Sequence, residues 1–244
     1  MKNFNSLLEG YNVTRFPKVS RSDLTEDDVS ALRTYGSQYY STPMNNALWH
    51  IKLMNNQHGY NRFAEHRQLH DSIISALNKF PASREDNFVY TGLSKHANPE
   101  KWSEGGLVYI PAFISTSYDS GIPRGFADVH GGTERTVYHA NGNPMMTTIE
   151  GGYMNGMKIK IPAGISAGGS IRNFTGIKEE KEYLIKPHQI LQITGAKTII
   201  KPKWEHWADM RYYHARILTP NEIEENADHP EVKRMLAVKR RLNI

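Results

Sequence analysis

The sequence Glu180-Lys181-Glu182-Tyr183-Leu184-Ile185 carries two acids immediately before a short apolar run. The aromatic and β-branched residues of that run are typical of a strand, so the acids are expected where the strand begins. Side chains two residues apart on a strand face the same way, which would pair Glu180 with Glu182 and turn Glu179 away from them. By itself, an acidic segment of this kind is most often an exposed turn.

Two other short segments precede it in the chain, Tyr90-Thr91-Gly92-Leu93 and Phe113-Ile114-Ser115-Thr116-Ser117. Each sets strand-forming residues beside small or hydroxyl-bearing ones. A Ser-Thr-Ser sequence at the end of a strand is usually an edge with hydrated hydroxyls. Neither segment therefore indicates a function alone, and the informative feature is that all three occur in this order.

The sequence before Pro81 predicts helices. Thr25 is a candidate N-cap, followed by acids that favour the positive end of a helix dipole, and Gly36 is a natural stop. Further helices are expected over 45–54 and 63–79, the second of them ended by Pro81.

The sequence after Pro81 predicts short strands, at 88–90, 113–115, 136–138, 157–161, 183–185 and 190–194. Asn141-Gly142 and Asn155-Gly156 are expected to be tight turns between strands. Many strands joined by short turns favour an antiparallel or mixed sheet over a doubly wound parallel one.

Helices followed by strands indicate the α+β class. The predicted division is one domain over 1–218, with a helical part over about 1–81 and a β-rich core over about 82–218. A basic helical tail is expected over 219–244, opened by the capping box Thr219-Pro220-Asn221-Glu222. A second helix of the tail would carry Lys233, Arg234, Lys239, Arg240 and Arg241.

The composition of the 244 residues excludes several kinds of site. The chain contains no cysteine, which excludes disulfides, thiolate nucleophiles and cysteine-based zinc sites, and its eleven histidines are scattered, so no metal is expected. No Rossmann or P-loop glycine pattern is present. The formal charge of +5 and the pI of about 9.2 favour acidic partners. No run of about 20 apolar residues suggests a membrane span, so we expect a soluble, cytoplasmic protein.

Taken together, the three segments resemble the arginine/Ser-Thr-Ser/Glu-x-Glu class of mono-ADP-ribosyltransferases. The resemblance spans roughly 24–195 and includes the flanking strands. Within this class, the sequence resembles the phage-encoded Alt/Mod type and the catalytic domain of actin-modifying exotoxins. The resemblance implies a mixed β core of two sheets around a cleft for NAD, with helices on the N-terminal side.

The resemblance also implies roles for individual residues. Glu182 would be the catalytic carboxylate, stabilising the cation that forms on the ribose when nicotinamide leaves. Glu180 would orient or deprotonate an acceptor arginine, and Ser115 would bond and orient Glu182. The residues expected to bind NAD are Tyr35, Tyr40, Asn45, Tyr90, Thr91, Gly92, Ser115, Thr116, Ser117 and Phe126. The stretch 172–178 would recognise the acceptor, with Phe174 near its tip.

One position departs from the family. Thr91 stands where these enzymes usually have an arginine, whose guanidinium fork holds an NAD phosphate. Three interpretations follow: another cation (Arg62, Arg67 or Lys95) substitutes, NAD is held more weakly, or the domain is a pseudoenzyme.

The resulting hypothesis is an NAD-dependent transferase that attaches ADP-ribose to arginine side chains of host proteins, such as transcription or translation machinery. We expect a monomer in the cytoplasm of a host bacterium, with packaging in a virion left open. The alternatives are an NAD glycohydrolase, in which water replaces the acceptor, and a non-catalytic module whose basic C-terminal helix binds RNA or an acidic host factor.

Overall fold

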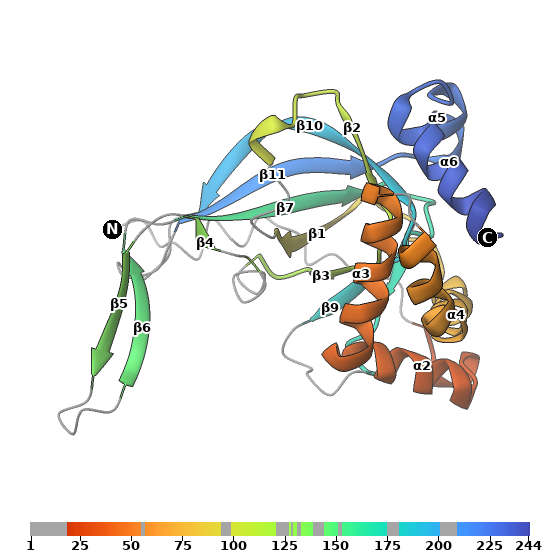
Figure 1. Cartoon of the computed structure of the whole chain (residues 1–244), viewed down its shortest axis with the longest axis horizontal. Helices are drawn as coiled ribbons and strands as arrows, with labels where there is room; N and C mark the ends of the chain where they lie inside the picture. Colours follow the sequence, from red (N-terminus) through yellow and green to blue (C-terminus); the bar gives the residue numbers. More distant parts are fainter. Residues whose placement is uncertain are drawn as a thin grey trace.

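The computed structural model describes residues 19–54, 57–93, 99–120, 127, 129–130, 133–138, 144–150, 153–174, 181–200 and 209–244. Figure 1 shows helices gathered at one end of a long twisted sheet, with a two-stranded ribbon at the other. The α+β class predicted from the sequence is confirmed. No helix in these ranges is both long and apolar enough to cross a bilayer.

Three helices form the N-terminal part: α2 (Glu26–Gly36), α3 (Gln38–Met54) and α4 (Gln57–Asn78), after a 3-10 turn, η1, at Arg21–Asp23. The predicted cap of α2 is confirmed, since Thr25 and Asp28 bond each other's backbone N–H in a capping box. Lys79 Nζ lies 2.5 Å from Asp28 Oδ2 and ties the end of α4 to the start of α2. α3 begins before the predicted residue 45, although Pro43 removes one backbone hydrogen bond inside it.

The strands form one continuous nine-stranded mixed sheet and a separate ribbon. The order is β2-β10-β11-β7-β1-β3-β9-β8, with β4 paired to β7. The bounds are β1 (Asn87–Gly92), β2 (Leu107–Ile110), β3 (Ile114–Ser117), β4 (Val129–His130), β7 (Tyr153–Ile161), β8 (Gly168–Ser170), β9 (Glu182–Ile185), β10 (Gln189–Ile200) and β11 (Asp209–Ile217), with β5 (Thr133–Tyr138) and β6 (Pro144–Glu150) in the ribbon. A short 3-10 helix, η2 (Pro99–Lys101), lies between β1 and β2.

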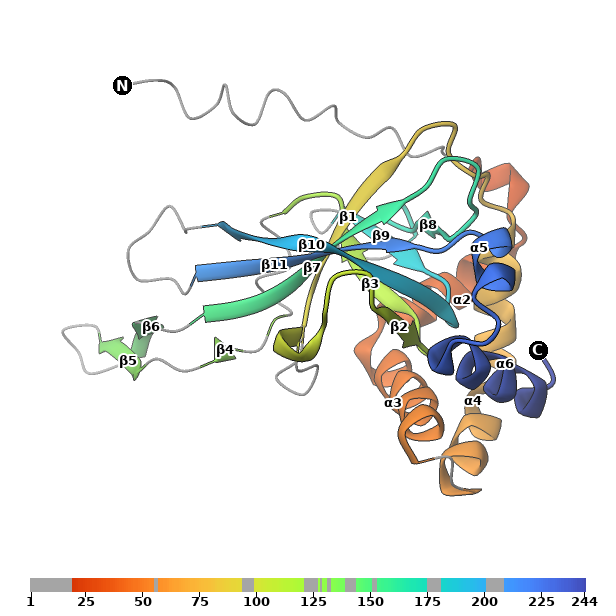
Figure 2. The same cartoon turned by 90° about the horizontal axis from the view of Figure 1, so that it is seen from above.

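The two sheets expected from the family resemblance are joined by hydrogen bonding into this one sheet. The joint is narrow: β1 and β3 share one Cα pair, Tyr90 with Ser117. This pair connects the β3-β9-β8 side of the sheet to the β1-β7-β11-β10-β2 side, and Figure 2 shows the same sheet from above, with the helices at one end. The candidate motifs lie at the joint.

Three clusters of buried side chains make up the core. The first packs α2 and α4 on Phe113, Leu184 and their neighbours, which covers the outer side of β9. The second packs α3 and the C-terminal helix on Tyr109 and Ile190. The third lies between the two sides of the sheet, with Val89, Ile159 and Tyr183 among its members.

The expected turn at Asn155-Gly156 is wrong, because both residues lie inside β7. A Cβ on Gly156 would come within 2.4 Å of Met210 Cε and 2.6 Å of Tyr212 Cε1. This glycine therefore allows two strands to pack closely rather than the chain to reverse. Asn141-Gly142 lies outside the described residues, between the paired strands β5 and β6.

The C-terminal segment is helical, as expected, with α5 (Pro220–Glu225) and α6 (Pro230–Leu242). Thr219 and Glu222 form the predicted capping box. α6 buries Val232, Met235 and Val238 in the second cluster, and its last turn is basic. The division into a domain and a tail stays a prediction.

Candidate active site

The predicted pair of Ser115 and Glu182 meets across two antiparallel strands. Ser117 of β3 lies opposite Glu182 of β9, which places Ser115 diagonally across from the same carboxylate, on the same face. The Ser115 hydroxyl donates a hydrogen bond to the Glu182 carboxylate. Glu182 is 6% exposed, whereas Ser115 lies at an exposed position of β3, so the bond joins a buried carboxylate to a hydroxyl at the surface.

Helix α2 carries Tyr35 and helix α3 carries Asn45, and a hydrogen bond joins the two side chains. The Asn45 side chain accepts the Phe113 N–H at 3.2 Å and donates to the Tyr35 hydroxyl at 3.3 Å. The rings of Tyr35 and Phe113 lie 5.4 Å apart. Burial raises the pKa of Tyr35 well above its ordinary value; the Asn45 bond opposes the rise and the charge of Glu182 adds to it. Tyr35 therefore stays a neutral hydroxyl, close enough to Glu182 for that charge to act on it.

The other two residues of the Ser-Thr-Ser motif hold backbone. The buried Thr116 hydroxyl donates to the Tyr183 carbonyl at 2.5 Å, which locks β3 to β9. The Ser117 hydroxyl accepts the Asp119 N–H at 3.0 Å and so shapes the chain leaving β3.

The first motif reaches the same place through β1. The Thr91 hydroxyl donates to the Ser115 carbonyl at 2.9 Å, so this side chain positions the strand that carries Ser115. Tyr90 packs its ring 5.3 Å from Tyr212. Gly92 pairs with Gly156 at the end of β1.

Of the cations suggested to replace the missing arginine, Arg67 is engaged elsewhere. Its guanidinium donates to the Leu242 carbonyl at 2.8 Å and the Asn243 carbonyl at 3.3 Å, at the end of α6. Arg62 is exposed on α4, and Lys95 lies outside the described residues.

The residue before Glu182 changes the argument about the paired acids. Lys181 has a φ of 48°, in the left-handed region, and its Nζ lies 2.9 Å from Asp119. The alternation of an extended strand therefore stops at Glu182, and the expectation that Glu180 faces the same way loses its basis. Glu180 itself lies outside the described residues.

Three further predictions have different outcomes. Phe174 is 6% exposed and packs its ring 6.3 Å from Phe80, so its expected place at the tip of a recognition loop is wrong. Tyr40 is 45% exposed on α3, with its ring 4.9 Å from Tyr39. Phe126 lies outside the described residues.

Sequence reasoning missed the contacts that connect these motifs. Asn45 bonds Phe113 and Tyr35, Thr91 bonds Ser115, and Lys181 bonds Asp119, and the partners are separated by 10 to 68 residues in the sequence. No local pattern in the sequence could have indicated them.

The arrangement can stabilise positive charge and bind a sugar hydroxyl. A fixed, buried carboxylate is suited to a cation that develops next to it, because the low dielectric strengthens the attraction. No cluster of three or more histidine, aspartate or glutamate side chains that could hold a metal occurs among the residues that the structure describes.

Comparison with known proteins gives the same fold. No protein-family model matches the sequence, and no curated protein does either. Vis toxin, an ADP-ribosyltransferase from Vibrio splendidus, is 20% identical with a TM-score of 0.50, over 82% of this chain and 76% of that one. Its complex with agmatine is 18% identical with a TM-score of 0.51, over 86% and 92%.

A second protein is similar to the same degree. Plx2a, an ADP-ribosyltransferase toxin from Paenibacillus larvae, is 17% identical with a TM-score of 0.52, over 82% of this chain and 89% of that one. The hydrogen-bonded Ser115–Glu182 pair thus lies in a chain that has the α+β fold of the ADP-ribosyltransferases.

Proposed function

We propose that the protein transfers ADP-ribose from NAD to arginine side chains and releases nicotinamide. The observation that carries the proposal is the hydrogen bond from Ser115 to the buried Glu182 carboxylate, at the sheet joint of an ADP-ribosyltransferase fold. The charge of the same carboxylate helps to raise the pKa of the buried Tyr35 hydroxyl. These groups fit a ribose, which offers hydroxyls to bond and develops positive charge when its glycosidic bond breaks.

When bound, NAD supplies nicotinamide as a leaving group that departs with the electron pair of the bond to ribose C1′. Glu182 would accept the ribose 2′-hydroxyl hydrogen bond, which strengthens as positive charge grows on the sugar. Ser115 would hold the carboxylate in one orientation, so that little reorganisation is needed. An acceptor nitrogen then bonds C1′ and loses one proton.

The arginine acceptor rests on two supports. Glu180, the first acid of the Glu-x-Glu motif, would orient the guanidinium and take its proton. The similar Vis enzyme has been crystallised with agmatine, a small molecule that ends in a guanidinium group. We also propose that the acceptor is a protein of a host bacterium and that the reaction takes place in its cytoplasm.

The test is Glu180→Gln, assayed with agmatine as acceptor. We expect transfer to agmatine to fall about 100-fold while NAD hydrolysis changes by less than about threefold, because water needs no guanidinium base. Glu179→Gln is the matched control and should keep both rates. Wild-type protein that consumes NAD without modifying agmatine or any lysate protein would instead be a glycohydrolase.

A further inference from the structure

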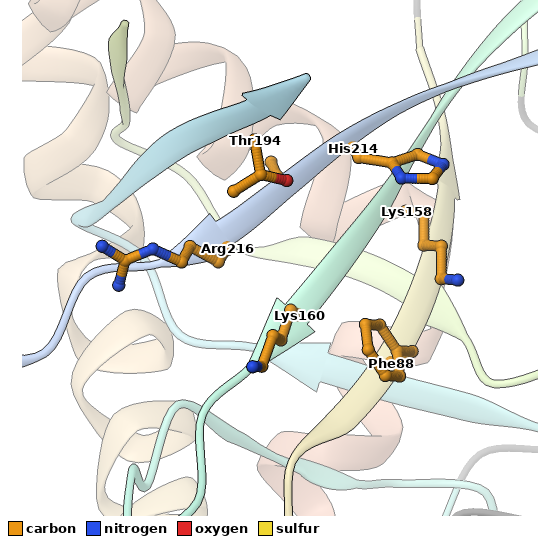
Figure 3. Close-up of a pocket in the computed structure, with 7 residues that line it drawn as sticks. Phe88, Lys158, Lys160, Thr194, His214 and Arg216 are labelled. Carbon is orange, nitrogen blue, oxygen red and sulfur yellow. The ribbon is translucent and has the colours of Figure 1, made fainter. Parts of the chain in front are cut away.

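A second site lies on the exposed face of the sheet formed by β1, β7, β11 and β10. A cavity of about 290 Å³ opens there. Figure 3 shows the side chains that line it: Phe88, Lys158, Lys160, Thr194, His214 and Arg216. Glu182, Ser115 and Tyr35 do not line it, so the cavity is separate from the candidate active site.

Strand register arranges the cations in two rows. Phe88, Lys160 and Arg216 pair in one row across β1, β7 and β11. Lys158 and His214 pair in the next row, two residues along. Paired residues point to one face, and rows two residues apart are about 7 Å from each other. The result is a group of neighbouring basic side chains around the cavity, two of which are paired with acids.

Acids at the margin hold two of these cations in place. Lys160 Nζ lies 2.5 Å from Asp86, and Arg216 lies 2.7 Å from Glu222 and 2.9 Å from Gln192. In the middle, Lys158 Nζ lies 4.6 Å from the centroid of the Phe88 ring. Burial lowers the pKa of Lys158, and burial followed by the charge of Lys158 lowers that of His214. A bound anion would offset this cost to the charged forms.

We propose that this face binds single-stranded nucleic acid, with backbone phosphates on Lys158 and Lys160 and a base on Phe88. An open sheet face that combines cations with an aromatic ring suits single strands, because every base has a stacking surface and every linkage carries a charge. The chain's net charge of +5 adds general attraction.

The experiment measures binding of a fluorescein-labelled 12-nucleotide single-stranded RNA by anisotropy, without NAD, over a range of salt concentrations. The pocket variant is the double substitution Lys158→Gln and Lys160→Gln. The control, Lys239→Gln with Arg240→Gln on α6, removes the same charge from another basic surface. Thermal melting checks that each variant is folded.

We expect the pocket variant to bind about tenfold more weakly and to lower the slope of log K against log salt by about 1.4, while the control stays within about twofold. Phe88→Leu should weaken binding at least about fivefold through lost stacking. Absence of wild-type binding at low salt would overturn the proposal, as would equal losses in both double variants. If poly-glutamate displaced the labelled RNA and Phe88→Leu left RNA binding unchanged, the proposal would be overturned and the face assigned to an acidic protein. AMP that binds as tightly as RNA would make it a mononucleotide site.

Discussion

Glu182 is a carboxylate with 6% of its surface exposed, and a buried polar group of this kind needs hydrogen-bond partners. Ser115 supplies one donor, and Tyr35, kept neutral by burial, lies close enough to feel its charge. Asn45 and Thr91 act one step further out: Asn45 fixes Tyr35 against Phe113, and Thr91 fixes the Ser115 backbone.

Thr91 also explains why an arginine is hard to place at this position. Its side chain is 9% exposed, and its hydroxyl already bonds the Ser115 carbonyl. A longer side chain there would overpack β1 and break that bond.

Removing the Ser115 hydroxyl tests the residue-scale account. We expect Ser115→Ala to lower kcat about 10- to 100-fold with a smaller change in the KM for NAD, because the hydroxyl orients the carboxylate rather than holding the donor. The measurement is steady-state nicotinamide release. Ser75→Ala, on the exposed side of α4, is the control and should be unchanged. A raised KM with unchanged kcat would contradict a positioning role.

At the scale of elements, β1, β7 and β11 pack closely around the end of the Tyr90-Thr91-Gly92-Leu93 segment. Gly156 is where these strands meet, and a Cβ there would also come within 2.9 Å of the Thr91 carbonyl oxygen. The close packing of β1, β7 and β11 therefore depends on one residue that has no side chain.

We expect Gly156→Ala to lower the free energy of unfolding by about 3 kcal/mol, because backbone and packed side chains must move. Gly164→Ala is the comparison: its φ is 78° and its surroundings are open, so only backbone strain of about 1 kcal/mol is expected. Urea denaturation measures both. A Gly156 variant no less stable than the Gly164 variant would show that the strands can separate there without cost.

Helix α4 meets the β9–β10 turn through two buried histidines. The rings of His70 and His188 lie 6.3 Å apart, and neither Nε2 has a hydrogen-bond partner among the described residues. Burial lowers the pKa of His188 to about 3, with smaller contributions from His70 and Lys239. Burial lowers that of His70 as well, against the raising effect of Asp71.

This contact predicts acid sensitivity. His188 takes up its proton near pH 6.5 when unfolded but near 3 when folded, so stability is complete above about pH 6.5 and falls as the pH drops towards 3. At pH 5 the titration of His188 is expected to lower the free energy of unfolding by about 2 kcal/mol. His188→Asn, which tolerates the φ of 59°, should remove that share of the pH dependence, whereas His58→Asn should not. Urea midpoints at pH 7.5 and 5.0 measure it, and equal pH dependence in all three proteins would contradict it.

Across the whole molecule, the features predictable from the sequence are those with local causes. The caps at Thr25 and Thr219 depend on residues three apart, and most strands after Pro81 have local β-forming composition. The single sheet could not be predicted, because its joint is one pair between Tyr90 and Ser117. β2 and β11 were missed although they pair extensively with β10.

The candidate site shows the same division. The meeting of Ser115 with Glu182 was expected from the motifs and is present. The left-handed backbone of Lys181 and the burial of Phe174 were not expected; the partners of these side chains, Asp119 and Phe80, are distant in sequence.

The central claim is that Glu182 drives cleavage of NAD, and the most direct measurement compares Glu182→Gln with wild type. Purified proteins are incubated with NAD labelled in the ADP-ribose part, with agmatine and with bacterial lysate. We predict that Glu182→Gln lowers both nicotinamide release and labelling about 100-fold or more while the protein stays folded, and that Glu224→Gln, on exposed α5, keeps both. Labelling by Glu182→Gln within about twofold of wild type would contradict the account.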